Sequence, residues 1–110
     1  MPGLPDAAFR VVGQDAIPDG FVVPFYLSDR TVRISFARAA GQLYAFDDLC
    51  TCPGDPCPLS GGLLTGTMIM CQCHGSEFDV TTGAVVSGPA ARPLNVHEVQ
   101  VADGAVRVRA

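Results

Sequence analysis

Cysteine and histidine, two residue types that commonly bind zinc and iron, gather in two short stretches of this chain. All five cysteines and one of the two histidines lie there: Cys50, Cys52, Cys57, Cys71, Cys73 and His74. The ligand pattern reads Cys-x-Cys, eighteen residues, then Cys-x-x-His, so two stretches can each supply a pair of ligands to a four-coordinate site. Thiolate and imidazole suit both zinc and iron–sulfur centres. The spacing alone does not choose between these metals.

The beginning of the chain bears on the redox state of these thiols. The stretch "MPGLPDAAFR" has no cationic start followed by an apolar run, so we expect no secretory signal and a cytoplasmic location. Cytoplasmic thiols stay reduced, and clustered cysteines there are more often metal ligands or redox groups than structural disulfides. The sequence therefore favours a metal or redox centre over a disulfide framework.

A single domain over residues 1–110 is expected, because a chain of 110 residues with 48% hydrophobic residues can bury an ordinary core. The formal net charge is −4, and lysine and arginine form no run. Binding to nucleic acid or to an anionic membrane requires clustered cations, so neither is expected as a partner. No apolar stretch reaches the length of about 18 residues that a membrane-spanning helix needs. An acidic surface fits a basic protein partner better.

Short segments rich in β-branched and aromatic residues, bounded by turn residues, predict an all-β domain. The expected strands are residues 9–12, 21–27, 31–37, 42–46, 67–71, 76–80, 94–102 and 105–109. Asp103-Gly104 separates two alternating runs and predicts a hairpin. No window keeps a helical period for three turns, so we expect little helix and a closed or sandwich-like arrangement of small sheets.

The candidate ligands fall between these strands or at their ends. Residues 47–62 show no alternation and are rich in glycine and proline after Cys52, which predicts a loop. Residues 71–78 begin with "CQCHGS" directly after an expected strand and must also turn. Two loops on a rigid β scaffold are a common way of building a small metal site.

Six segments, within and beyond the ligand stretches, follow one another along the chain: "IPDG", "LYAFDDLCT", "PLSGG", "CQCHGSEFD", "TGAVVSGPA" and "RPLNVHEVQVADGAVRV". In type and order they resemble the segments of Rieske-type ferredoxins. The resemblance covers nearly the whole chain and implies a Rieske-type fold of small antiparallel sheets, with a two-loop subdomain that holds a [2Fe–2S] cluster. Carried over residue by residue, it implies that Cys50 and Cys71 bind the inner iron and that His74 binds the outer iron.

The chain departs from the family pattern at position 52, where a histidine is expected and the sequence reads "CTC". The resemblance then implies Cys52 as the second ligand of the outer iron, which gives three thiolates and one imidazole. The alternative is that Cys57 takes this place, since the first loop is two residues longer than the pattern. The additional thiolate adds negative charge, so we expect a reduction potential between about −400 mV for all-cysteine clusters and about −150 mV for the lowest His₂ clusters.

The same resemblance assigns further positions around the cluster. Cys57 and Cys73 match the extra cysteines that form a disulfide between the two loops in high-potential members, although a reducing cytosol favours free thiols instead. Ser76 occupies the place of a hydroxyl that donates to a cluster sulfide, and Phe78 stands where high-potential members have a tyrosine. Residues 87–90 resemble the loop that covers the cluster, with a proline that excludes water.

The resemblance implies an electron carrier rather than an enzyme, namely a ferredoxin component of a multicomponent oxygenase. It would accept one electron from a flavoprotein reductase and deliver it to a terminal oxygenase or another redox enzyme. Docking is expected near His74, Gly75 and Pro89, because the outer iron lies nearest solvent in the family.

Two other functions remain open for this ligand pattern. One is a zinc-binding module that uses the same three cysteines and one histidine. The other is a cluster-free structural or regulatory subunit of a reductase, in which Cys52 marks a lost ligand. A [2Fe–2S] protein is brown and both alternatives are colourless, so visible absorption separates them.

Overall fold

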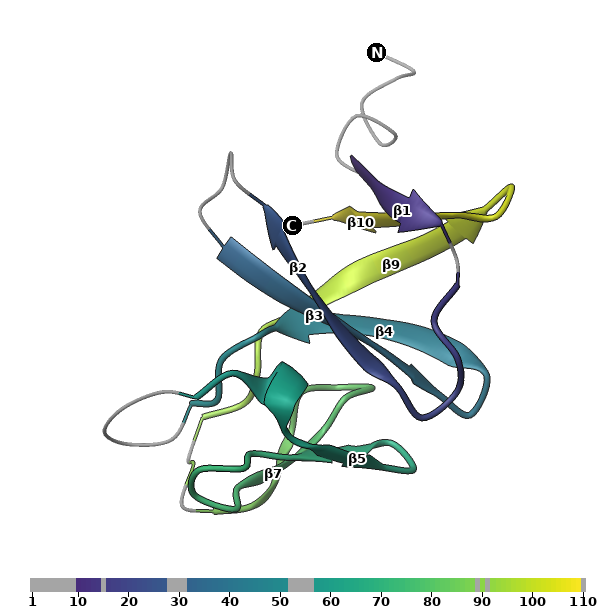
Figure 1. Ribbon diagram of the computed structural model, residues 1–110. Coiled ribbons are helices and arrows are strands. Elements are labelled where there is room, and N and C mark those ends of the chain that lie inside the picture. Colours follow the sequence, from purple (N-terminus) through teal and green to yellow (C-terminus); the bar gives the residue numbers. More distant parts are fainter. Residues whose placement is uncertain are drawn as a thin grey trace.

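The described part of the chain contains ten β-strands and one short 3₁₀ turn in this computed structural model (Figure 1). The structure describes residues 10–14, 16–27, 32–51, 57–88, 90 and 92–109. The strands form one six-stranded and one four-stranded sheet, and each strand pair in them is antiparallel. The all-β class expected from the sequence is confirmed.

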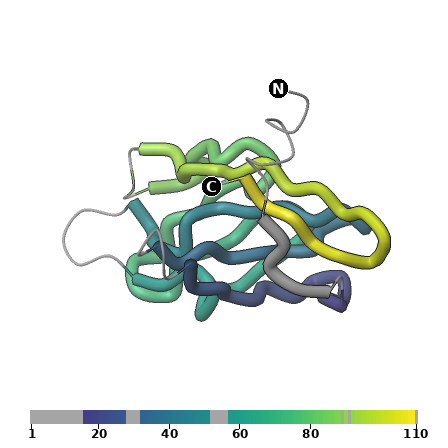
Figure 2. Tube along the Cα trace, turned by 90° about the horizontal axis from the view of Figure 1, so that it is seen from above, coloured from purple at the N-terminus to yellow at the C-terminus, as the bar shows by residue number. Residues whose placement is uncertain are grey.

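The six-stranded sheet is the larger part of the scaffold. Its strands are β1 (Arg10–Gln14), β2 (Val22–Leu27), β3 (Val32–Ala39), β4 (Gln42–Asp47), β9 (Val96–Ala102) and β10 (Ala105–Arg109), in the spatial order β1-β10-β9-β4-β3-β2. The ladder between β4 and β9 is short and pairs Ala45 with His97 and Phe46 with Val96. The two halves that it joins are inclined to each other, so the sheet curls (Figures 1 and 2).

The four-stranded sheet is inserted between β4 and β9 and lies at one end of the molecule (Figure 1). It contains β5 (Leu63–Thr65), β6 (Met68–Met70), β7 (Glu77–Asp79) and β8 (Val85–Ser87) in sequence order, and the 3₁₀ turn η1 (Leu59–Gly61) precedes it. Both cysteine-bearing stretches belong to this insertion: the first leads from β4 to η1, and the second joins β6 to β7. The larger sheet therefore carries a subdomain in which the candidate ligands lie.

Strands β3 and β4 separate two hydrophobic cores. The first core fills the curled sheet and consists of Leu27, Ile34, Phe36, Ala45, Val106 and Val108. The second core includes two cysteines and consists of Ala37, Ala39, Phe46, Cys50, Leu59, Ile69, Cys71, Phe78, Val80, Ala90 and Leu94. Because side chains alternate along a strand, Ala45 of β4 points into the first core and its neighbour Phe46 into the second. These two strands are thus buried on both faces.

Two strand connections are two-residue turns with positive φ angles. The predicted hairpin at Asp103-Gly104 joins β9 to β10, with φ angles of 54° and 74°. Ala40 and Gly41 join β3 to β4 in the same way, with φ angles of 52° and 78°. Consecutive positive φ angles give the turn whose twist matches the twist of the flanking strands. The hairpin prediction is confirmed.

The sequence pattern does not predict β5 and β8. Each lies at an edge of the small sheet and forms through pairing with β6 or β7, a partner that its own three residues do not reveal. The 3₁₀ turn η1 likewise lies inside the expected loop 47–62. The other expected strands are present, with ends shifted by at most two residues. The described residues contain no helix that is long and apolar enough to cross a membrane.

Candidate metal centre

Three of the four expected ligands come together at one end of the second core. The ligand atoms of Cys50, Cys71 and His74 all lie within 4.8 Å of one another. The cysteines are 4% and 0% exposed, whereas His74 is exposed to solvent. The fourth expected ligand, Cys52, lies outside the described residues, as does Pro89. The described part of the site therefore has a buried thiol side and a solvent-facing imidazole side.

The first loop folds around the sulfur of Cys50. The Cys50 N–H donates to the carbonyl oxygen of Cys57 at 3.0 Å, and the Cys57 N–H donates to Cys50 Sγ at 3.5 Å. The following turn η1 buries Leu59 and is closed by the Gly62 N–H, which donates to the Leu59 carbonyl oxygen at 2.9 Å. Hydrogen bonds to ligand sulfurs are among the factors that set the potential of an iron–sulfur cluster. The loop thus places an N–H donor beside a candidate ligand.

The second loop is a tight reversal between β6 and β7. The Cys71 N–H donates to the Ser76 carbonyl oxygen at 2.8 Å, and the Gly75 N–H donates to the Cys71 carbonyl oxygen at 2.9 Å. Gly75 has a φ angle of 75°, a left-handed backbone conformation that residues other than glycine rarely adopt. This reversal buries Cys71 and leaves His74 at the exposed tip.

A disulfide bond joins the two loops. It links Cys57 of the first loop to Cys73 of the second, with Cα atoms 6.3 Å apart. Of the two alternatives for these cysteines, the structure has the disulfide rather than free thiols. A sulfur atom in a disulfide is not a thiolate, so in this state Cys57 does not offer a ligand to iron.

Two further residues from the sequence analysis lie against the cysteine ligands. Ser76 is fully buried, and its Oγ accepts a hydrogen bond from the Ala90 N–H at 3.0 Å. This bond ties the second loop to residues 87–90, the segment expected to cover the cluster. Phe78 is also fully buried and belongs to the same core as the two cysteines. Its apolar side chain lacks the hydroxyl group that a tyrosine would place there.

Asp48, two residues before Cys50, is a buried polar residue that sequence reasoning missed. Its side chain is fully buried and is bound by side chains from β3 and from η1. The available signal is the alternation along β4: Phe46 faces the second core, so Asp48, the next residue of that face, must face it too. A carboxylate at an inward position indicates a hydrogen-bonded group.

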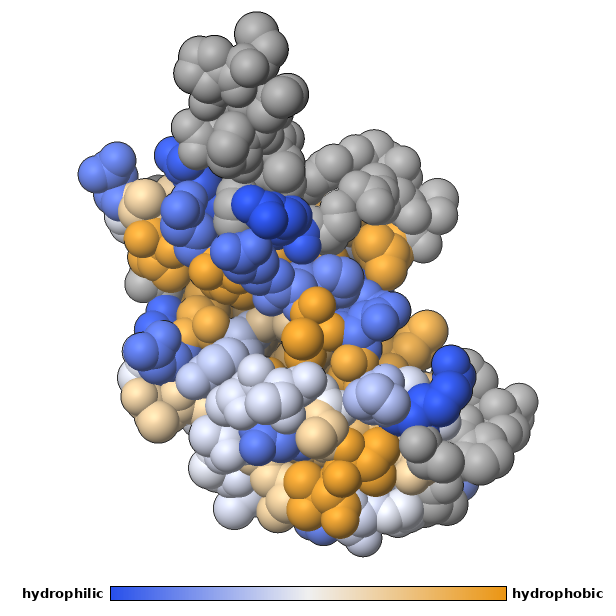
Figure 3. Space-filling view, turned by 180° about the vertical axis from the view of Figure 1, so that it is seen from behind, coloured by the Kyte–Doolittle hydropathy of each residue, from blue (hydrophilic) through white to orange (hydrophobic). Residues whose placement is uncertain are grey.

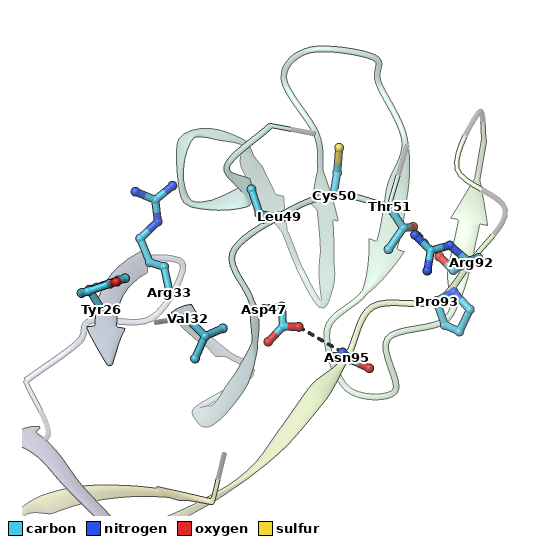
Figure 4. Close-up of a pocket in the computed structure, with 10 residues that line it drawn as sticks. All are labelled: Tyr26, Val32, Arg33, Asp47, Leu49, Cys50, Thr51, Arg92, Pro93 and Asn95. Carbon is cyan, nitrogen blue, oxygen red and sulfur yellow. Dashed lines mark hydrogen bonds between the residues drawn. The ribbon is translucent and has the colours of Figure 1, made fainter. Parts of the chain in front are cut away.

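An open groove of about 600 Å³ runs past the cysteine side of the site (Figure 4). Ten residues line it: Tyr26, Val32, Arg33, Asp47, Leu49, Cys50, Thr51, Arg92, Pro93 and Asn95. Arg33 and Arg92 stand on opposite sides of it (Figure 4). Within the lining, Asn95 Nδ2 donates to Asp47 Oδ2 at 3.1 Å, and Asp47 Oδ1 also lies 2.6 Å from Nε2 of the strand residue His97. The groove therefore reaches from the surface of the molecule to one candidate ligand, Cys50.

Apolar side chains reach the surface both in this groove and away from it. Seen from behind, they appear in several separate areas between polar ones (Figure 3). Leu49, the residue before Cys50, is 48% exposed, and Leu63 of β5 is 59% exposed. The cluster end therefore offers apolar as well as polar contacts to a protein partner.

The donor set and its burial suit an iron–sulfur cluster with mixed thiolate and imidazole ligands. A family model described as Rieske [2Fe–2S] domain matches residues 7–100 of the chain. The chain belongs to the Rieske [2Fe–2S] domain family. Membership confirms the resemblance seen in the sequence and the cofactor that it implied. In this Rieske domain the described residues that suit the [2Fe–2S] cluster are Cys50, Cys71 and His74.

Relatives of this Rieske domain include ferredoxins, several of them components of dioxygenase systems. Ferredoxin CarAc from Metapseudomonas resinovorans is 44% identical over 71 residues, which are 64% of each chain, so the match spans just under two thirds of that protein. The ferredoxin component of the naphthalene 1,2-dioxygenase/salicylate 5-hydroxylase systems from Ralstonia sp is 32% identical over 87 residues, 79% of this chain and 80% of that one.

The fold agrees with these relatives. A chain in the solved complex of reduced oxygenase and oxidized ferredoxin in carbazole 1,9a-dioxygenase superposes with a TM-score of 0.82 at 32% identity, over 93% of both chains. The Sphingomonas yanoikuyae B1 ferredoxin superposes with the same TM-score at 27% identity. The Rieske-type fold expected from the sequence is therefore confirmed.

Proposed function

We propose that this chain is a one-electron carrier, the ferredoxin component of a multicomponent oxygenase. The observation that carries the proposal is the meeting of Cys50, Cys71 and His74 within 4.8 Å, in a Rieske domain whose relatives include ferredoxin components of dioxygenase systems. When bound, the cluster accepts and releases one electron. The chain itself holds the cluster, shields its thiolate side from water and presents its imidazole side, as a single domain over residues 1–110. It is a carrier rather than an enzyme.

Four residues are proposed as ligands. Cys50 and Cys71, which are buried, hold the inner iron, and the exposed His74 belongs to the outer iron. We assign Cys52 as the second ligand of the outer iron. The disulfide supports this choice over Cys57, because it occupies the Cys57 sulfur. The resulting three thiolates place the reduction potential below that of two-imidazole Rieske clusters.

Residues around the ligands adjust the cluster. The Ser76 hydroxyl would donate to a sulfide of the bound cluster, while its oxygen accepts a hydrogen bond from the Ala90 N–H. Phe78 contributes no such donor, which keeps the potential lower. The segment 87–90, with Pro89, covers the cluster and excludes water.

Redox partners dock at the histidine side, near His74, Gly75 and Pro89. The exposed imidazole next to two buried cysteines supports this site, because the electron path to a partner is shortest there. A flavoprotein reductase supplies the electron, and a terminal oxygenase or another redox protein accepts it. The net charge of −4 favours partners with basic docking surfaces. Nucleic acid and membranes are not partners, and the location is cytoplasmic.

Metal analysis and a mixing experiment test the function together. Protein purified without oxygen should contain two iron and two acid-labile sulfide atoms per chain and no zinc. Its visible bands should bleach with a reduced flavoprotein reductase and return when an oxidised terminal oxygenase is added. One zinc per chain would instead support the zinc-binding module. A folded protein with neither metal would support the cluster-free subunit of a reductase.

A further inference from the structure

Asp48 is a fully buried carboxylate surrounded by four donor groups. Its Oδ1 accepts hydrogen bonds from the Ser35 hydroxyl at 2.6 Å and from the Ser60 N–H at 2.6 Å. Its Oδ2 accepts from the Ser60 hydroxyl at 3.0 Å and lies 2.5 Å from Arg33 Nε. Charge-assisted hydrogen bonds are about twice as strong as neutral ones, so four of them hold one orientation of this side chain firmly.

These bonds close the first cluster loop and attach it to the sheet. Asp48 stands at the start of the loop and Ser60 near its end, so one side chain joins the two ends of the segment that contains Cys50. Arg33 and Ser35 belong to β3 and anchor the carboxylate to the scaffold. The Asp48 N–H also donates to the Arg33 carbonyl oxygen at 2.9 Å, which fixes its backbone.

The carboxylate is close enough to the cluster site to affect its charge. Asp48 is two residues from Cys50, so their Cα atoms lie at most about 7 Å apart. Both residues are buried, at 0% and 4% exposure, where charges are poorly screened. A negative charge there disfavours the addition of an electron, and the positive charge of Arg33 opposes this effect. The Arg33 side chain is 44% exposed, so screening by solvent weakens the effect of its positive charge at the cluster site.

We propose that Asp48 is a positioning residue for the cluster: its carboxylate holds the first loop closed around Cys50 and, with Arg33, sets the charge beside that ligand. The closure of the loop concerns the protein alone. The effect on the potential rests on the proposed function, because it requires the cluster.

Two variants and a matched control separate these effects. Asp48→Asn keeps the shape of the side chain, removes its charge and turns an NH₂ group toward donors. Arg33→Gln removes the opposing charge from an exposed side chain. Asp47→Asn, the control, makes the same chemical change one residue away, at a side chain that binds Asn95 and His97 rather than the loop.

Hydrogen exchange measured by mass spectrometry on residues 57–62 tests the closure of the loop. We expect exchange about tenfold faster in Asp48→Asn, because a buried donor loses its acceptor. Exchange in Asp47→Asn should stay within about twofold of the unmodified chain. Equal exchange in the two variants would overturn the positioning role. The test reads the loop with or without iron, so a protein that lacks a cluster would contradict the proposed function without affecting this result.

The midpoint potential of the cluster tests the charge effect. We expect Asp48→Asn to raise the potential and Arg33→Gln to lower it, with a smaller shift in Asp47→Asn. A purely structural loosening of the loop would give no such opposite signs. Shifts of the same sign in the first two variants, or an equal shift in the control, would overturn the charge assignment.

Discussion

At the scale of single residues, the identity of position 52 sets the charge of the proposed ligand set. Cys52→His restores the two-imidazole pattern and removes one thiolate. The midpoint potential should therefore rise by about 100 mV or more, toward the range above about −150 mV, because a less negative site accepts an electron more readily. A redox titration followed by EPR measures this change. A potential that does not move would show that Cys52 is not bound to iron.

The disulfide allows a second test of single residues. Replacing both Cys57 and Cys73 by serine opens a link across sixteen residues. The free energy of unfolding should fall by about 3 kcal/mol, since the unfolded chain is no longer restrained. Iron content should stay at two atoms per chain if neither residue is a ligand. Denaturant unfolding and iron analysis measure the two quantities. Loss of iron in Cys57→Ser but not in Cys73→Ser would make Cys57 the fourth ligand.

The resemblance to the Rieske family points to Cys50, Cys71 and His74 from the sequence, and the structure brings their ligand atoms within 4.8 Å of one another. Asp48 cannot be found in this way. A carboxylate is ordinary in itself, and its role depends on donors that the fold brings from Ser35 and Ser60, 13 and 12 residues away. Likewise, the spacing of the cysteines does not decide whether Cys57 is a free thiol, an iron ligand or part of a disulfide. A disulfide with Cys73 depends on how the two loops approach each other.

At the scale of secondary-structure elements, Gly62, which directly follows η1, packs closely against Met70 at the end of β6. A Cβ atom added at Gly62 would collide with the Met70 carbonyl oxygen. Gly62→Ala should therefore lower the free energy of unfolding by about 2 kcal/mol and speed the loss of iron to a chelator. At Gly88 the nearest atoms to an added Cβ, both of Ala90, are 3.7 Å away, so Gly88→Ala is the matched control. Equal stability of the two variants would contradict the close contact.

The two edge strands of the small sheet are not predictable from the sequence, whereas its central strands and the strands of the larger sheet are. The eight expected strands are those with visible alternation or β-branched runs, such as Ala105–Arg109. Strands Leu63–Thr65 and Val85–Ser87 pair only with their neighbours in the small sheet, so their own three residues carry little signal. The glycine at position 75 indicates a turn, but the direction in which that turn presents His74 comes from bonds to Cys71.

At the scale of the whole molecule, β3 and β4 lie between the two hydrophobic cores. Only the second core contains candidate ligands, Cys50 and Cys71. Phe46→Ala empties space in the second core and should cost about 4 kcal/mol of unfolding free energy, together with faster loss of iron. Val108→Ala in the first core should lower stability while leaving the EPR spectrum unchanged. Unfolding curves and spectra of both variants provide the comparison. Equal effects on the spectrum would contradict the separation of the two cores.

The central claim is a [2Fe–2S] cluster held by three cysteines and one histidine, and EPR of the dithionite-reduced protein, purified without oxygen, tests it most directly. The account predicts visible absorption in the oxidised state and, after reduction, a spin-one-half signal. Its average g value should lie between those of two-histidine Rieske clusters and all-cysteine clusters. A colourless protein without this signal would contradict the claim. So would an average g value equal to that of two-histidine Rieske clusters or to that of all-cysteine clusters.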